Sequence, residues 1–318
     1  MSHQRIINLI GGRGYTGSEL LQLISAHPDM DLGVASSRSV AGQSISSICE
    51  GWPDDGRTFT QLEPAGVSVH PADAWVLALP NGLAGEWVEA ILAAFPDAVI
   101  LDLSADYRFD SQWTYGLPER FRDQLRDARL ISNPGCYATG AQLGLLPLAE
   151  DLRSDPVIFG VSGFSGAGKT PSPRNDPKVL KDNMIPYSLS GHMHEKEVSH
   201  QLQCAVRFMP HVAAFFLGIS LTIAFELDYP TSADELEVLF KQAYEGEKRV
   251  RVSRDIPQVS GVQKTADVNI GGFDIDARNP AQGSLVVVLD NLLKGAATQA
   301  LQNLNLALGL DENAGINS

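Results

Sequence analysis

Residues 6–17 read Ile-Ile-Asn-Leu-Ile-Gly-Gly-Arg-Gly-Tyr-Thr-Gly, an apolar run that ends in a glycine-rich turn. The apolar run predicts a buried strand, and the spacing of leucine and isoleucine over residues 15–26 predicts a helix after the turn. Glycine permits a tight turn and lets a pyrophosphate approach main-chain N–H groups at the N-terminus of a helix. This order therefore predicts a dinucleotide site, against the alternative of an ordinary strand-to-helix turn. The residues predicted to contact the cofactor here are Gly11, Gly14, Tyr15, Thr16 and Gly17.

The second strand, predicted over residues 31–36, indicates which cofactor the site prefers. It ends in Ser36, Ser37 and Arg38, where a site for NAD usually has an Asp or Glu that binds the ribose 2′-hydroxyl. Two hydroxyls and a guanidinium are suited instead to a 2′-phosphate. The sequence therefore favours NADP, with a solvated turn arginine as the alternative.

The first 150 residues continue to alternate short apolar runs with helical periodicity. Such alternation is typical of a doubly wound, Rossmann-type parallel sheet with helices on both faces. Residues 40–64 interrupt the pattern and are interpreted as an excursion rich in turn residues. The predicted elements are strands over 75–79, 98–103 and 129–132 and a helix over 82–95.

The rest of the chain has longer connections between its apolar runs. Ser232 and Glu235 form the pattern of a capping box at the start of a helix. This organisation predicts an α+β domain with an antiparallel or mixed sheet. The predicted elements are strands over 157–162, within 206–227, over 250–252 and over 284–289, an irregular region over 163–190 and a last helix over 292–308.

Composition narrows the class of protein. The 318 residues carry a formal net charge of −14, which argues against binding to a nucleic-acid backbone. Three cysteines without paired spacing argue against a disulfide scaffold and favour a cytoplasmic protein. The longest apolar stretch, residues 212–225, is too short to span a bilayer, so no membrane partner is predicted. Apolar strands in the second domain predict a homodimer or homotetramer.

Residues 163–170, Gly-Phe-Ser-Gly-Ala-Gly-Lys-Thr, match the phosphate-loop pattern of nucleoside triphosphatases. That loop functions because its Lys and Thr begin a helix. Pro171, Pro173 and Pro177 follow here and disfavour a helix. A phosphate-loop ATPase therefore remains only an alternative, although Ser165 and Lys169 are still suited to bind an anion.

Cys136 is the candidate nucleophile. It follows Ser-Asn-Pro-Gly at residues 132–135 and precedes a predicted helix that carries Leu145, Leu148 and Leu152. The positive end of a helix dipole favours a thiolate at such a position. Cys49 and Cys204 are interpreted as small buried side chains.

Residues 190–197, Ser-Gly-His-Met-His-Glu-Lys-Glu, offer a proton partner for a thiolate. His192 and Glu197 are five residues apart, so a carboxylate at the start of a helix would orient the imidazole. The alternatives are a solvated helix start and a metal site made by His192, His194 and Cys136. No metal is predicted.

These residues belong to stretches that run from the first strand to the last helix. With them, the sequence resembles the N-acetyl-gamma-glutamyl-phosphate reductases, NADPH-dependent enzymes of arginine biosynthesis within the aspartate-semialdehyde dehydrogenase superfamily. The stretches that carry the resemblance are 14–20, 101–108, 132–139, 161–169, 191–194 and 290–296.

The resemblance implies a mechanism. Cys136 would attack an acyl phosphate and form a thioester, NADPH would deliver hydride, and the thiohemiacetal would collapse to N-acetylglutamate 5-semialdehyde. His192 would be the acid/base group, oriented by Glu197. Arg108, Lys169 and His194 would bind the substrate. Further cofactor contacts are implied at Pro80, Ser165, Gly166 and Asn291.

The resemblance also implies two domains: an NADP-binding domain of residues 1–135 completed by 291–318, and a catalytic and oligomerisation domain of residues 136–290 of the glyceraldehyde-phosphate-dehydrogenase-like type. Met193 stands where the family more often has Arg. This difference leaves open a related reductase that acts on an aminoadipyl or aspartyl phosphate. A noncatalytic NADP-binding sensor is a further alternative.

Overall fold

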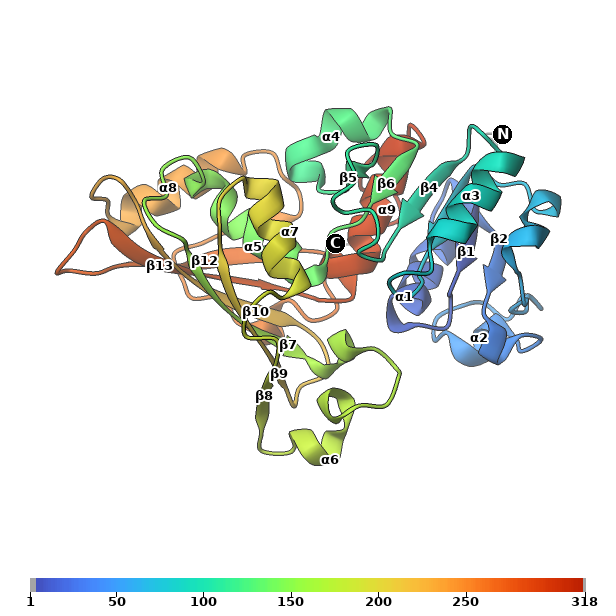
Figure 1. Ribbon diagram of the computed structural model, residues 1–318, viewed down its shortest axis with the longest axis horizontal. Coiled ribbons are helices and arrows are strands. Elements are labelled where there is room, and N and C mark those ends of the chain that lie inside the picture. Colours follow the sequence, from blue (N-terminus) through green and yellow to red (C-terminus); the bar gives the residue numbers. More distant parts are fainter. Residues whose placement is uncertain (1–3, 317–318) are drawn as a thin grey trace. The chain divides into compact units, whose positions relative to one another are not determined.

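The computed structural model describes residues 4–316, and the chain forms two compact units (Figure 1). The first unit contains the chain up to Gly135 together with the segment that starts at Ala296, and the second unit is Cys136–Gly295. Residues 291–295 therefore belong to the second unit, whereas the sequence predicted them in the first. The reason is packing, because Asn291 and Gly295 contact residues of the second unit.

The first unit is built on a six-stranded sheet in the order β2-β1-β3-β4-β6-β5. Every neighbouring pair of strands is parallel, which confirms the predicted Rossmann-type sheet. The strand bounds are β1 Arg5–Ile10, β2 Met30–Ser36, β3 Ala74–Leu77, β4 Val99–Asp102, β5 Thr114–Tyr115 and β6 Leu130–Ser132.

Helices cover both faces of this sheet. One face buries Trp75 and Ile100 against Ile91 of α3 and against the 3-10 turn Pro64–Val69. On the other side, α9 packs against α1, α4 and β4. The helix bounds are α1 Tyr15–Ser25, α3 Gly85–Ala94, α4 Pro118–Arg126 and α9 Thr298–Ala307. Helix α4 and the two-residue strand β5 were not among the predicted elements.

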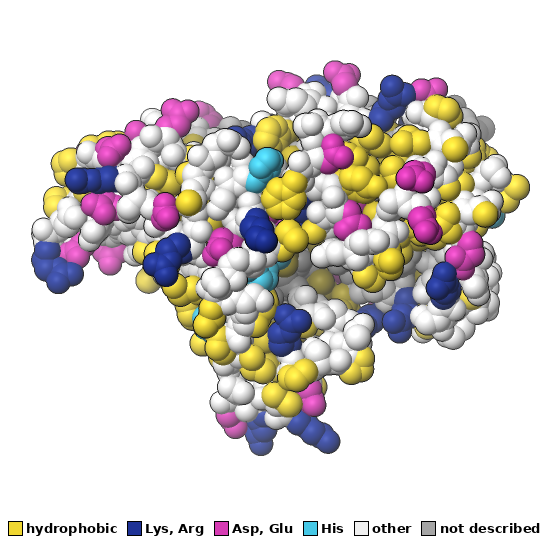
Figure 2. Space-filling model, viewed as in Figure 1, with side chains coloured by type: hydrophobic (Ala, Val, Ile, Leu, Met, Phe, Trp, Pro, Cys, Tyr) yellow, Lys and Arg dark blue, Asp and Glu magenta, His cyan; other side chains and the backbone are white. Residues whose placement is uncertain are grey.

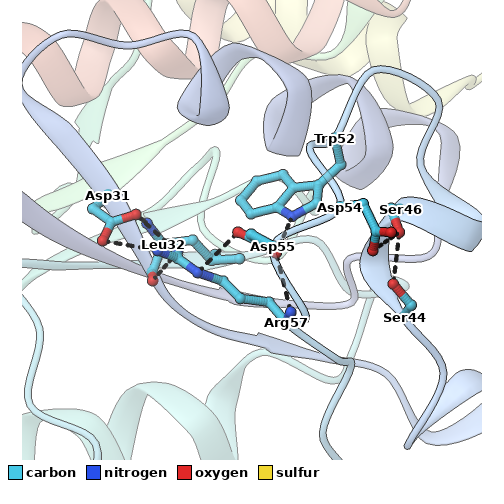
Figure 3. Close-up of polar contacts among 8 residues, drawn as sticks. All are labelled: Asp31, Leu32, Ser44, Ser46, Trp52, Asp54, Asp55 and Arg57. Carbon is cyan, nitrogen blue, oxygen red and sulfur yellow. Dashed lines mark hydrogen bonds and ion pairs between the residues drawn. The ribbon is translucent and has the colours of Figure 1, made fainter.

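The excursion over residues 40–64 is joined to β2 by several hydrogen bonds, three of which come from the Arg57 side chain (Figure 3). The Arg57 guanidinium donates to both carboxylate oxygens of Asp31, at 2.8 and 3.1 Å, and to the carbonyl of Leu32 at 2.8 Å. Asp55 accepts hydrogen bonds from the Arg57 main-chain N–H and from the Trp52 indole. The excursion thus contains little regular structure apart from the short helix α2 (Ile45–Ile48). Its place on the sheet is nevertheless fixed by these bonds.

The second unit contains a seven-stranded sheet in the order β11-β12-β13-β10-β7-β9-β8. Neighbours β7 and β9 are parallel, whereas β10 is antiparallel to both β7 and β13, so the sheet is mixed, as one of the two predicted options. The bounds are β7 Val157–Gly163, β8 Met184–Pro186, β9 Arg207–Ala213, β10 Ile219–Glu226, β11 Val250–Val252, β12 Val268–Ile275 and β13 Gln282–Leu289.

One face of this sheet is covered by helices. Helix α5 (Cys136–Leu145) packs against β10, β13 and α7 (Met193–Leu202), while α8 (Ala233–Ala243) packs against β11 and β12. The close approach of α5 needs small residues, since a Cβ on Gly140 would lie 2.8 Å from the side chains of Leu221 and Leu289. The predicted capping box of Ser232 and Glu235 is present at the start of α8.

Two predicted helices are wrong in detail, and strand β12 of the second unit was not predicted. The helix after Cys136 ends at Leu145, because Pro147 follows, and does not continue to Leu152. Strand β12 was missed because Gly271-Gly272 interrupts its apolar pattern. The last helix starts as a π-helical turn, Leu293–Ala297, before α9 begins.

Two further properties of the molecule are the distribution of its surface charges and the character of its helices. On the face drawn in Figure 2, acidic and basic side chains are interspersed. Within residues 4–316, no helix is both long and apolar enough to cross a membrane.

Candidate active site

The candidate active site of the second unit is a small cavity at the N-terminus of α5. Cys136 is the first residue of this helix and is partly buried, so its sulfur lies where the helix dipole stabilises a thiolate. The cavity has a volume of about 160 Å³, and Cys136 shares it with His192, Tyr187 and Arg174. The structure therefore brings the predicted nucleophile and the predicted acid/base group, 56 positions apart in the sequence (192 − 136), to one cavity.

His192 is held by the helix that follows it. It is the N-cap residue of α7, and its Nδ1 accepts the main-chain N–H of His194 at 3.1 Å. The proton of the neutral ring is therefore on Nε2, and Nδ1 takes up a further proton by releasing the His194 N–H. Burial lowers the pKa of His192, the Glu195 carboxylate opposes this effect, and the Arg174 charge lowers the pKa further. The imidazole is thus neutral, and able to accept a proton, at neutral pH.

The carboxylate that acts on His192 is that of Glu195. Its two oxygens accept main-chain N–H groups of Gly191 at 2.8 Å and Phe208 at 2.9 Å, so they hold the turn before His192 against β9. Glu195 is the third residue of α7, the position from which an acidic side chain reaches back to the helix start. Glu197, the residue predicted to orient His192, is fully buried, and its orienting role stays a prediction.

Two tyrosines also line the cavity and were not predicted as site residues. Tyr137 donates its hydroxyl to the carbonyl of His211 at 2.7 Å, and its ring lies 5.8 Å from that of His194. Burial raises the pKa of Tyr137 well above its ordinary value and that of Tyr187 to about 12. Both phenols therefore stay protonated and act as hydrogen-bond groups.

The loop over residues 163–170 does not form a phosphate loop. Phe164–Ala167 is a 3-10 turn, Gly168 has a φ of 75°, and no α-helix begins at Lys169 or Thr170. This is the outcome expected from the prolines that follow. Lys169, a predicted substrate ligand, is exposed on this loop and is not among the residues that line the cavity.

Ser165 and Asn291, two predicted cofactor contacts, meet inside the second unit. The Asn291 amide donates to the Ser165 hydroxyl at 2.8 Å and accepts the main-chain N–H of Gly218 at 2.7 Å. Gly166 follows this buried pair, and a Cβ there would lie 2.8 Å from the Ser162 hydroxyl. The loop after β7 is thereby fixed to the end of β13.

The glycine turn of the first unit has the geometry of a dinucleotide site. Gly11 has a φ of 90°, and a Cβ there would overlap the main chain of Ala78. A Cβ on Gly17 would lie 2.9 Å from the main chain of Gly11 and Gly12. Gly14 precedes α1, whose first residues are Tyr15 and Thr16. The turn therefore leaves the start of α1 open to a phosphate.

The residues predicted for the 2′-phosphate are placed differently from one another. Ser36 is buried, and its hydroxyl accepts the main-chain N–H of Leu62 at 3.1 Å. Ser37 is half-buried directly after β2. Arg38 is exposed, and its guanidinium binds the Glu63 carboxylate through two hydrogen bonds of 3.1 and 2.9 Å. Pro80 is exposed just after β3.

Arg108, another predicted substrate ligand, lies in the first unit. It is buried, and its guanidinium donates to the carbonyls of Asn133 at 2.9 Å and Leu103 at 3.1 Å. These bonds hold the segment that precedes Cys136. Binding of substrate by Arg108 stays a prediction.

The comparisons with known proteins agree with this arrangement. A family model described as semialdehyde dehydrogenase, NAD binding domain, matches residues 6–128, and one described as semialdehyde dehydrogenase, dimerisation domain, matches residues 136–291. The chain belongs to the semialdehyde dehydrogenase family.

The relatives of this semialdehyde dehydrogenase include the N-acetyl-gamma-glutamyl-phosphate reductase of Xanthomonas campestris, which is 48% identical over 306 residues and 96% of each chain. The mitochondrial protein arg-6 of Neurospora crassa is 48% identical over 98% of this chain, which corresponds to 36% of that protein. The resemblance drawn from the motifs is thereby confirmed.

Solved structures confirm the fold. The aspartate semialdehyde dehydrogenase II of Vibrio cholerae, complexed with ASA, superposes with a TM-score of 0.76 at 20% identity, over 96% of this chain and 98% of that one. The aspartate semialdehyde dehydrogenase of Candida albicans, solved with NADP, gives a TM-score of 0.72 at 16% identity, over 95% of this chain and 98% of that one.

Within residues 4–316, no group of three His, Cys, Asp or Glu side chains is arranged to hold a metal ion. The alternative of a site made by His192, His194 and Cys136 has no support in this geometry.

Gly295 is a residue that sequence reasoning did not single out. It lies behind the nucleophile of this semialdehyde dehydrogenase, and a Cβ there would lie 2.8 Å from the Cβ of Cys136 and 3.2 Å from the carbonyl oxygen of Asp290. The π-helical turn Leu293–Ala297 is what brings this glycine against α5. Its lack of a side chain therefore sets the position of the Cys136 main chain.

We expect Gly295→Ala to lower kcat by about 100-fold, because displacing a nucleophile by around 1 Å has an effect of that order. Steady-state kinetics and the melting temperature would be measured together. Gly261→Ala is the matched control, since a Cβ at Gly261 meets no atom within 4 Å. A Gly295→Ala enzyme with normal kcat would show that this contact does not position Cys136.

Proposed function

We propose that this semialdehyde dehydrogenase catalyses the NADPH-dependent reductive dephosphorylation of N-acetyl-L-glutamyl 5-phosphate. The products are N-acetyl-L-glutamate 5-semialdehyde and phosphate, in a step of arginine biosynthesis. The observation that carries this proposal is the cavity in which Cys136, at a helix N-terminus, lies with the neutral imidazole of His192. The names of relatives 48% identical to the chain support the acyl group.

The chain's own residues account for the covalent step. The Cys136 thiol loses its proton to His192, and the thiolate attacks the carbonyl carbon of the acyl phosphate. The C–S bond forms, the C–O bond to phosphate breaks, and phosphate leaves with the bonding electron pair. NADPH, when bound, supplies the hydride that reduces the thioester. His192 then moves the proton needed for collapse of the thiohemiacetal to the aldehyde and the free thiol.

The glycine turn is the part of the chain that would hold the cofactor. A Cβ on Gly11 or Gly17 would collide with nearby main chain, so these glycines permit the tight turn, whereas a Cβ on Gly14 would lie 3.7 Å from the carbonyl oxygen of Gly11. The N–H groups at the start of α1 would bind the pyrophosphate. Arg38 would bind the 2′-phosphate, which is what favours NADPH over NADH. Ser36 supports this site through its main chain, since its carbonyl accepts the N–H groups of Gly11 and Gly12.

The Arg38–Glu63 ion pair provides a test of cofactor preference. A 2′-phosphate must compete with Glu63 for the guanidinium, so Glu63→Gln is expected to lower the KM for NADP by about two- to fivefold, a range typical of an exposed pair. The KM for NAD should not change. Arg38→Leu should raise the KM for NADP alone. If both cofactors respond equally to Arg38→Leu, the arginine is a solvated turn residue.

Assembly and location complete the proposal. The family model names a dimerisation domain, and the sheet face opposite α5 carries the partly exposed Phe159 beside His211. A homodimer or homotetramer would cover this face. We also propose a cytoplasmic location, in keeping with cysteines that form no disulfide.

The test is the reverse reaction. N-acetylglutamate 5-semialdehyde, phosphate and NADP are incubated with the enzyme, and NADPH is followed by absorbance, with aspartate semialdehyde and the aminoadipyl analogue in parallel. Phosphate-dependent turnover of the N-acetylglutamyl compound, well above that of the other two, is expected. Turnover restricted to another semialdehyde would keep the chemistry and replace the substrate. No turnover of any of the three semialdehydes would contradict the proposal.

A further inference from the structure

Among the described residues, Arg174 is the only arginine or lysine that lines the catalytic cavity. It lies on the 3-10 turn Pro173–Asn175, and its guanidinium carbon is 4.8 Å from the centroid of the Tyr187 ring. Over residues 4–316, no carboxylate pairs with this guanidinium. A cation stacked on an aromatic ring keeps its N–H groups available for an anion.

The turn that carries Arg174 is fixed by its neighbours. The Asn175 side chain donates to the carbonyls of Gly168 and Thr170, both at 2.7 Å, and accepts the main-chain N–H of Ser172 at 2.8 Å. One amide thus joins the loop after β7 to the Arg174 turn. The cation is therefore presented by an ordered segment, although its side chain is exposed.

The size of the cavity indicates which part of a substrate it takes. Its volume of about 160 Å³ is well below the roughly 300 Å³ at the lower end for sites that enclose a whole small molecule. It holds the reacting end of the substrate, which must lie against Cys136. In an acyl phosphate, the phosphoryl group is joined through one oxygen to the attacked carbon, whereas the α-carboxylate is several carbons away.

We propose that Arg174 binds the phosphoryl group of the acyl-phosphate substrate and stabilises the leaving phosphate, with Tyr187 as the platform of the guanidinium. The inference rests on the proposed function and names the residue that holds one group of its substrate. A guanidinium matches phosphate oxygens with two parallel hydrogen bonds. Its charge also acts on His192 and Tyr187, which places it among the reacting groups.

The experiment measures the reverse reaction at varied phosphate, with semialdehyde and NADP saturating. For Arg174→Met, the KM for phosphate is expected to rise by roughly 10- to 100-fold, the effect of losing charge-assisted hydrogen bonds. The KM for the semialdehyde should change by less than about threefold, because that substrate lacks the phosphoryl group. Arg174→Lys should recover part of the affinity, since a lysine keeps the charge without the paired geometry.

Lys178→Met is the matched control, because Lys178 is exposed on the next short helix (α6, Pro177–Leu180) and does not line the cavity. A rise in the KM for the semialdehyde with unchanged phosphate affinity would assign Arg174 to the α-carboxylate and overturn the proposal. A phosphate effect in Lys169→Met but not in Arg174→Met would also overturn it. If the wild-type enzyme uses another semialdehyde, the same phosphate titration applies, so the two failures are distinguishable.

Discussion

Cys136→Ser is expected to lower turnover by about 10⁴- to 10⁶-fold, the range seen when a catalytic nucleophile is removed. The serine hydroxyl is far less ionised than a thiol at the same helix N-terminus, so the acyl transfer has no effective nucleophile. The variant should still fold and bind NADP, because the glycine turn belongs to the other unit. Steady-state turnover and cofactor binding would be measured on the same preparation.

Cys204→Ser is the control for this variant. Cys204 is partly buried outside the cavity, and burial raises the pKa of its thiol, so it is the less reactive cysteine. Its substitution should leave turnover within about twofold of the native enzyme, as for surface changes away from a site. Cys136 should likewise react first with an alkylating reagent. Normal turnover in Cys136→Ser would remove the nucleophile assignment. A native enzyme without turnover, whose Cys136 reacts no faster than a free thiol, would favour a noncatalytic NADP-binding role.

His192→Asn is expected to lower kcat by about 10²- to 10⁴-fold, the usual contribution of a general acid/base. Asparagine is chosen because it is a favourable N-cap residue and preserves a bond to the His194 N–H. His192→Ala removes both the proton transfer and the cap, and its stability should fall by a further ~1 kcal/mol. Equal kcat in the native and Asn enzymes would show that another group moves the proton.

The pH profile follows from the surroundings of His192. Burial and Arg174 lower its pKa and Glu195 raises it, so the neutral imidazole persists below the ordinary value of 6.5. The acid limb of kcat/KM should therefore lie below pH 6.5. Glu195→Gln removes the group that raises the pKa, so the limb should move to lower pH. A shift to higher pH would contradict the assignment of Glu195 as the charge that acts on His192.

Local sequence patterns predicted the Rossmann-type unit, but they did not predict strands that form mainly through pairing with a neighbouring strand. The strand, glycine turn and helix at residues 5–25 follow from short-range signals, namely an apolar run, a glycine-rich turn and helical spacing. The structure gives Gly11 in this turn a positive φ. Strand β12 has no such signal, because Gly271 and Gly272 interrupt its apolar pattern. The structure requires glycine at position 271, since a Cβ there would overlap the main chain of Ser253 and Asp255. Strand β5 is too short for any periodicity and exists through its pairing with β6.

The candidate site was predictable only where a residue has a local context. Cys136 and His192 each lie at the start of a helix that the sequence predicts. Arg174 does not, because a proline-rich 3-10 turn brings it into the cavity and no spacing rule links it to Cys136. Glu195 could have been found by placing the start of α7 at Met193, which makes it the third helical residue.

The central claim is that Cys136 carries the acyl group during the reaction. It is tested most directly by mixing the enzyme with N-acetylglutamyl 5-phosphate in the absence of NADPH and measuring the intact mass. We expect one added N-acetylglutamyl group, located on the peptide that contains Cys136 and lost when NADPH is supplied, with release of the semialdehyde. An enzyme that turns over normally yet never shows this adduct, or shows it on another residue, would contradict the account.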